Sequence, residues 1–158
     1  ARSVISRRPK PKSDTIDNLQ HRLRNLFYFN PTASAISGSI QDVDLTGDRI
    51  VVHLAPAAYE KFTSLNSDEL VRSTLSASLL VPALVLALEK IMRPEDREVL
   101  MDLRWCRTVI KKLKDIDIDV ESLSEGGENS LVLSNKLIGD PLSAALEDLT
   151  QILLRAED

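Results

Sequence analysis

The chain has 158 residues, a net charge of −4 and 43% hydrophobic residues, a composition typical of one globular domain. Its single cysteine, Cys106, excludes an internal disulfide framework and a four-cysteine zinc site, and it fits a reducing compartment. The longest uncharged run, residues 73–88, is shorter than the about 20 apolar residues that a membrane span needs. We therefore expect a soluble cytoplasmic protein that does not enter a membrane.

Basic residues are concentrated at the amino-terminal end. Residues 1–12 carry five basic groups and no acid, whereas the rest of the chain carries 24 acids against 15 bases. Two prolines and little apolar surface predict that residues 1–13 form a disordered basic arm or linker. Residues 14–158 are expected to form a single globular domain. An acidic body with a short basic arm is not the profile of a dedicated DNA-binding domain.

The first predicted elements are a helix and a hairpin. Helical spacing of apolar residues predicts a helix over residues 14–28, which Asn30-Pro31 ends. Residues 39–54 carry the clearest β signal, with Gly47-Asp48 as the turn. This turn pairs Val43 with Val52 and gives the ribbon one apolar face and one mostly polar face.

Helices are predicted for most of the remaining chain. A short helix should run over residues 56–62, and Ser67 should cap a central apolar helix that reaches about residue 92. Pro82 predicts a kink or break in that helix near Leu80. A further helix is expected over residues 95–114.

The carboxyl-terminal third begins with an ambiguous segment. Isoleucine and valine alternate with aspartate over residues 115–120, which could be a short strand that extends the hairpin. Helices then follow over about 130–138 and 141–155, with Gly139 after the first and Asp140 capping the second. The predicted fold is mainly α (α+β), with five or six packed helices and one β-hairpin near residues 39–54.

Three constellations resemble chemical sites but are better explained structurally. The acidic segment at 115–119 lacks the glycine and the bidentate glutamate of a calcium loop. Cys106 lies on the apolar stripe of its predicted helix, where a free cysteine behaves as a small hydrophobe. His53 with Asp42 resembles a catalytic base and its orienting acid, yet a cross-strand charge pair explains both residues. We expect no catalytic residues, no cofactor and no metal.

A basic stripe on the helix predicted over residues 95–114 could bind phosphates, together with the amino-terminal arm. The candidate anion or nucleic-acid contacts are Arg7, Arg8, Lys10, Lys12, Arg104, Arg107, Lys111 and Lys114. Such a stripe is more often a solvated face.

We consider two functions in detail, while an enzyme with an unconventional carboxylate site stays open as a less favoured alternative. The first is a non-enzymatic protein–protein interaction or assembly module that belongs to a larger protein or a multi-subunit complex, with a protein partner or a second copy of the chain as its ligand. The alternative is a nucleic-acid-associated protein that uses the basic arm and the basic stripe. The dependence of binding on salt distinguishes the two.

Overall fold

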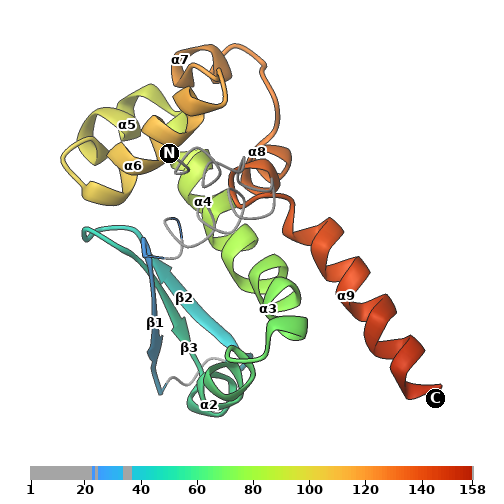
Figure 1. Ribbon diagram of the computed structural model, residues 1–158. Helices are drawn as coiled ribbons and strands as arrows, with labels where there is room; N and C mark the ends of the chain where they lie inside the picture. The colour runs from blue at the N-terminus through green and yellow to red at the C-terminus, as the bar shows by residue number, and fades with distance from the viewer. Residues whose placement is uncertain (1–22, 24, 34–36, 158) are drawn as a thin grey trace, which may run out of the picture.

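The protein is mainly helical with a small β-sheet, as the sequence predicted (Figure 1). The sheet has three strands of mixed direction. The computed structural model describes residues 23, 25–33 and 37–157. The basic arm, with Arg7, Arg8, Lys10 and Lys12, lies outside these residues, as does most of the helix predicted from residue 14.

The sheet consists of β1 (Phe27–Pro31), β2 (Ile40–Asp44) and β3 (Ile50–Leu54), with β3 in the middle. β2 and β3 form the predicted antiparallel hairpin, and Val43 is paired with Val52 as expected. Its apolar face packs inward, because Ile50, Val52 and Leu54 are all buried. The predicted hairpin and its register are therefore confirmed, with one irregularity between Ile40 and Asp42. The turn differs from the type II′ turn expected at Gly47-Asp48, because Gly47 lacks the positive φ that the first loop residue of such a turn requires.

The third strand comes from an unexpected part of the chain. β1 pairs in parallel with β3, in a segment whose first residues were predicted to be the end of a helix. Phe27 is buried, Tyr28 is exposed and Phe29 is half-buried, which is the two-residue period of a strand. The prediction that the helix extends to residue 28 is wrong, because pairing with β3 overrides the helical spacing.

Residues 116–120 do not form a strand. Asp117 has a left-handed φ of 62°, and the Ile118 amide donates to the Leu113 carbonyl at 2.9 Å, which closes the preceding helix. The Asp119 carboxylate then caps the short helix α7 (Val120–Leu123). The alternation of apolar and acidic residues thus reflects a helix end followed by a helix cap, and the predicted strand is wrong.

The central apolar helix is built from α3 (Glu69–Leu75), η2 (Ser76–Leu80) and α4 (Val81–Met92), and α2 (Pro56–Leu65) precedes it. Its cap is Asp68, whose carboxylate accepts from the Leu70 amide, and not Ser67 as predicted. The predicted irregularity near Leu80 is a π-helical turn, in which the Val81 amide donates to the Ser76 carbonyl. Since Pro82 has no amide hydrogen, such a wider turn accommodates it without breaking the helix.

The helix predicted over residues 95–114 is two helices, α5 (Pro94–Leu100) and α6 (Arg104–Asp115). Leu103 between them is extended, with φ −87° and ψ 137°. The Asp48 carboxylate, from the hairpin turn, accepts from the Arg104 amide at 3.1 Å. A residue distant in sequence therefore caps α6, which explains why local spacing missed the break.

The last two helices match the sequence prediction closely. They are α8 (Ser130–Leu137) and α9 (Pro141–Ala156). Gly139 has a φ of 87°, and the Asp140 carboxylate accepts from the Ser143 amide as the cap of α9. Glycine is favoured at the end of a helix because it adopts this left-handed conformation easily.

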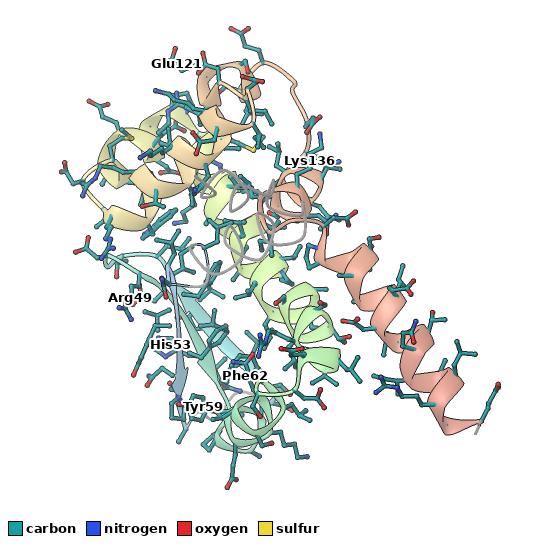
Figure 2. The ribbon with its side chains drawn as sticks, in the orientation of Figure 1. Arg49, His53, Tyr59, Phe62, Glu121 and Lys136 are labelled. Carbon is teal, nitrogen blue, oxygen red and sulfur yellow. The ribbon has the colours of Figure 1, made fainter. Side chains whose placement is uncertain are left out.

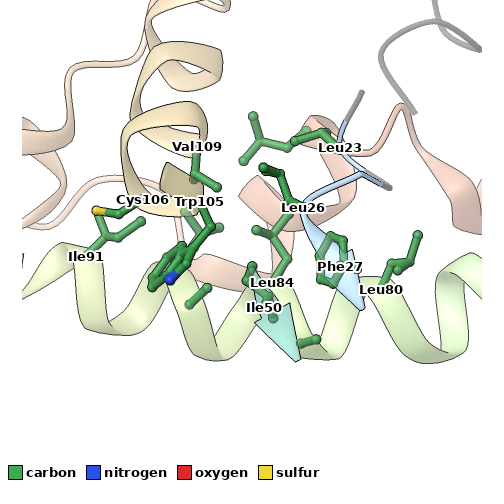
Figure 3. Packing of buried hydrophobic residues seen from close by; sticks show 14 of the residues in the cluster. Leu23, Leu26, Phe27, Ile50, Leu80, Leu84, Ile91, Trp105, Cys106 and Val109 are labelled. Carbon is green, nitrogen blue, oxygen red and sulfur yellow. The ribbon is translucent and has the colours of Figure 1, made fainter. Parts of the chain in front are cut away.

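The core surrounds α4, which contacts β3 on one side and α8 on another. Leu84, Leu88 and Ile91 are completely buried and belong to one core cluster with Trp105 of α6 and Ile50 of β3. Figure 3 shows the ring of Trp105 beside α4, between Ile91 and Leu84. The continuous helix Glu69–Met92 is long and apolar enough to cross a membrane, but 44% of its most apolar window is buried inside this fold. A helix in a protein core can have the same length and composition, so one such helix is weak evidence for a membrane span.

Candidate interaction surface

Helix α9 has one face packed against the protein. Its buried or half-buried residues include Pro141, Ala145 and Ile152, which recur at helical spacing. This face contacts α3 and, near the start of α9, the π-helical turn η2. In Figure 1, α9 runs along α3 and then ends at the edge of the molecule.

A second face of α9 carries leucines that remain exposed. Leu142, Leu146, Leu149 and Leu153 have exposed fractions of 55%, 58%, 42% and 67%. Their spacing alternates between four and three residues, so they form one stripe along the helix, as the contact positions of a coiled coil do. We call these four residues the leucine stripe.

The residues that flank the leucine stripe carry no charge over most of its length. Ser143 and Thr150 lie on one side, and Ala145 and Ile152 lie on the other. The acidic side chain of Glu147 projects from a different part of the helix, since it follows Leu146 by one residue. The stripe is therefore an uninterrupted apolar band.

A hollow of about 470 Å³ adjoins the first residue of the stripe. Its walls come from the start of α9, from α8 and from the central helix, and its lining residues are Ala77, Val81, Leu131, Val132, Asn135, Lys136, Asp140 and Leu142. Figure 2 shows Lys136 on α8, near the point where the chain turns into α9. The hollow and the stripe are continuous through Leu142.

Exposed apolar side chains are concentrated on these two helices. Seven of the fourteen large hydrophobic residues that are exposed in the described part of the chain belong to α8 or α9. They are Leu131, Val132, Leu142, Leu146, Leu149, Leu153 and Leu154. Leu154 follows Leu153 by one residue and therefore projects, like Glu147, from a different part of the helix. We call the surface formed by Leu131, Val132 and the leucine stripe, with the hollow, the α8–α9 face. A contiguous apolar patch of this kind is typical of a protein interaction site.

The basic stripe lies where the sequence placed it. Arg104, Arg107, Lys111 and Lys114 are all exposed on α6. None of them has a carboxylate within 4.0 Å among the residues that the structure describes. Lys112 instead turns inward, where it pairs with Asp115 at 3.8 Å. The predicted contacts on α6 thus form one exposed group of cations, in which the Arg107 guanidinium also donates to the Asp102 carbonyl at 2.8 Å.

Cys106 is completely buried in the core cluster. Burial raises the pKa of its thiol from 9.0 to about 11, because the opposite influence of Arg97 and Arg107 is weaker. The folded protein therefore favours the protonated thiol, and this contribution to stability is present below pH 9 and is lost as the pH rises through 11. The setting is unlike that of a nucleophilic cysteine, which needs a lowered pKa.

We expect native Cys106 to react with a thiol-specific reagent at pH 8 about 100-fold more slowly than in the denatured chain, since reaction requires the core to open. The rate of colour release from an aromatic disulfide reagent, with and without denaturant, measures this difference. Equal rates in both conditions would show that Cys106 is accessible.

His53 does not form the pair with Asp42 that the sequence suggested. The two residues are neighbours across the strands, but the Asp42 carboxylate accepts from the Val43 amide. Nδ1 of His53 lies 2.9 Å from the Thr32 hydroxyl and 3.2 Å from the Asn30 amide nitrogen. These contacts tie β1 to β3 and supply no acid to orient a catalytic base.

The acidic segment also has structural contacts. The Asp119 carboxylate accepts from the Glu121 amide at 3.1 Å, and Asp115 pairs with Lys112. Within the described ranges, no group of three histidine, cysteine, aspartate or glutamate side chains is placed to hold a metal ion.

Sequence reasoning identified the basic stripe but missed the α8–α9 face. The signal that could have found it is the spacing of the four leucines of α9, read together with their uncharged flanks. Among known proteins, neither the protein-family models, nor the curated proteins, nor the solved structures contain a match to this chain.

Proposed function

We propose that this chain is a non-enzymatic protein–protein interaction or assembly module, that it works within a larger protein or a multi-subunit complex, and that the α8–α9 face is its docking surface. The observation that carries this proposal is the leucine stripe, whose four side chains are 42–67% exposed. Nothing in the described fold covers them.

The energetics favour a docking surface over a solvated helix. Complete burial of a leucine is worth about 1.5–3 kcal/mol, so each half-exposed leucine of the stripe still has about half of that to gain. A partner that covered the stripe and filled the hollow would bury all four leucines at once, and the free energies of their burial would add to the affinity of binding. Exposure of the four leucines to water contributes no favourable free energy. It is not needed to hold α9 in place either, because the other face of α9 already contacts α3.

A photoreactive amino acid tests this proposal directly. We expect benzoylphenylalanine in place of Leu146 to form covalent adducts with a protein in cells that produce the chain. The matched control is the same substitution at Glu147, which is exposed on the same helix but outside the stripe. Absence of adducts from positions 142, 146 and 153 alike would contradict the proposal.

Nucleic-acid binding is the second candidate function, and the observation that favours it is the set of four exposed cations on α6 without carboxylate partners in the described chain. Cations that bind phosphates release counterions, so binding weakens steeply with salt. The acidic remainder of the domain opposes it, which is why this function ranks second.

If α6 binds nucleic acid, replacing Arg107 and Lys111 with alanine should reduce the slope of log affinity against log salt by about 2, because each cation that binds a phosphate contributes about 1 to that slope. Fluorescence anisotropy with labelled duplex and single-stranded oligonucleotides, at several salt concentrations, gives this slope. The control is Lys61→Ala, because Lys61 is an exposed cation on α2. No binding by the unaltered chain at low salt would eliminate this function.

A further inference from the structure

We propose that the α8–α9 face binds a second copy of this chain, with the two α9 helices antiparallel about a two-fold axis midway along the leucine stripe. This inference rests on the proposed function, since it assigns a partner to the same surface. Three features of the described residues support it: the symmetry of the stripe, the positions of the hollow and of the most exposed leucine, and the charges near the stripe.

The stripe is symmetric about its own midpoint. The spacing runs four, three and four residues from Leu142 to Leu153, so reversal of the helix leaves the pattern unchanged. An antiparallel second copy therefore places its Leu153 level with Leu142 and its Leu149 level with Leu146. All four leucines of each helix then meet leucines, as the contact positions of a coiled coil require.

The hollow and the most exposed leucine lie at opposite ends of the stripe. The hollow adjoins Leu142 at the start of α9, whereas Leu153, at 67% exposed, stands near its end. An antiparallel two-fold brings Leu153 of each copy to the hollow of the other. The contact is then isologous, with the same patch used twice, and it closes as a dimer without forming an open chain.

The charges near the stripe favour the same arrangement. The flanking residues Ser143, Ala145, Thr150 and Ile152 are uncharged, so two copies bring no like charges together along the seam. Glu157 follows the last turn of α9, and Lys136 stands at the rim of the hollow, where it also pairs with Glu128 at 2.7 Å. Lys136 is already paired with Glu128, and Asp140 lies at the same rim, so among the described residues this end of the stripe offers no free cation to Glu157. A parallel pair places Glu157 near its own equivalent, and an antiparallel pair avoids this contact of like charges.

The size of the face predicts a weak dimer. A helix of the length of α9 is about 24 Å long and 10–12 Å across. The area that one face of α9 can bury is therefore less than the roughly 800 Å² per partner of a standard interface. Leu131 and Val132 on α8 extend the contact beyond α9. We therefore expect a dissociation constant of about 1–100 μM, within the range of sedimentation measurements on the full chain.

The first test is sedimentation equilibrium over a range of concentrations. We expect the unaltered chain to dimerise reversibly and Leu146→Glu to raise the dissociation constant about 100-fold or more, because each dimer then buries two carboxylates in its centre. Leu65→Glu is the matched control, since Leu65 is 46% exposed on α2 and lies outside the face. It should leave the dissociation constant unchanged, and circular dichroism confirms that both variants fold.

The second test fixes the orientation with a pair of introduced cysteines. Leu142→Cys and Leu153→Cys, combined in one chain, should give a covalent dimer with a short bismaleimide, and each single variant should stay monomeric. The two positions are about 16 Å apart along one helix, beyond the reach of a short reagent within a single copy. Cys106 is completely buried, so it does not compete for the reagent.

The outcomes separate this inference from the proposed function. Dimers from both single variants would indicate a parallel pair and overturn the antiparallel arrangement. A chain that stays monomeric at every concentration would show that a second copy is not the partner. If the photoreactive residue at position 146 still forms adducts with a different protein, the proposed function stands with that protein as the partner. Adducts within one chain, to residues 1–22, would overturn both, because the chain would then cover its own face.

Discussion

Replacing Trp105 with alanine is expected to lower the free energy of unfolding by about 3–5 kcal/mol. The side chain is completely buried, and it is the only tryptophan of the sequence. Its indole nitrogen donates to the Leu45 carbonyl at 3.1 Å, so it joins α6 to the end of β2. The alanine variant loses this packing and leaves the carbonyl of a buried residue without its donor. Urea denaturation followed by circular dichroism measures the change.

A matched variant separates packing from hydrogen bonding at this position. Trp105→Phe keeps an aromatic ring but cannot donate to the Leu45 carbonyl, and we expect it to cost about 1–3 kcal/mol beyond the effect of the smaller ring. An alanine variant as stable as the unaltered chain would show that Trp105 does not join the helical body to the sheet.

The parts of the fold that could be predicted are those where a local pattern determines the structure. In the hairpin, the alternation of apolar residues on both sides of Gly47 selects one register, and the structure confirms this register. The type of turn could not be predicted in the same way, because Gly47 does not adopt a positive φ. The junction between α8 and α9 was equally clear from local residues. Gly139 favours the end of one helix, Asp140 caps the next, and Pro141 favours its first position.

The parts that could not be predicted depend on residues distant in sequence. β1 is a strand because it pairs with β3 across more than twenty residues, and its few apolar residues also fit a helix. The break before α6 lies where the Asp48 carboxylate, from the hairpin turn, accepts from the Arg104 amide and so caps the start of α6. In both places a contact made only in the folded state overrides the local preference.

The two candidate surfaces differ in the same way. Arg104, Arg107, Lys111 and Lys114 could be placed on one exposed side of α6 from their spacing, because charged residues are usually exposed. Lys112 of the same helix is the exception, since it is buried. A row of leucines is usually the buried face of a helix, whereas in α9 the buried face is the adjacent one, with Pro141, Ala145 and Ile152. Only the position of α3 determines which face is covered.

Leu84→Ala is expected to lower the free energy of unfolding by about 2–5 kcal/mol. Leu84 is completely buried in the first half of α4, on the helix that the sequence predicted to be central. Because α4 contacts both β3 and α8, neither element can shift into the space left by the leucine side chain without losing other contacts. A cavity should therefore remain. Leu86→Ala is the control on the same helix, since Leu86 is 48% exposed, and it should change the stability by no more than about 0.5 kcal/mol. Equal and small effects of the two substitutions in urea denaturation would show that α4 is not the central helix of the fold.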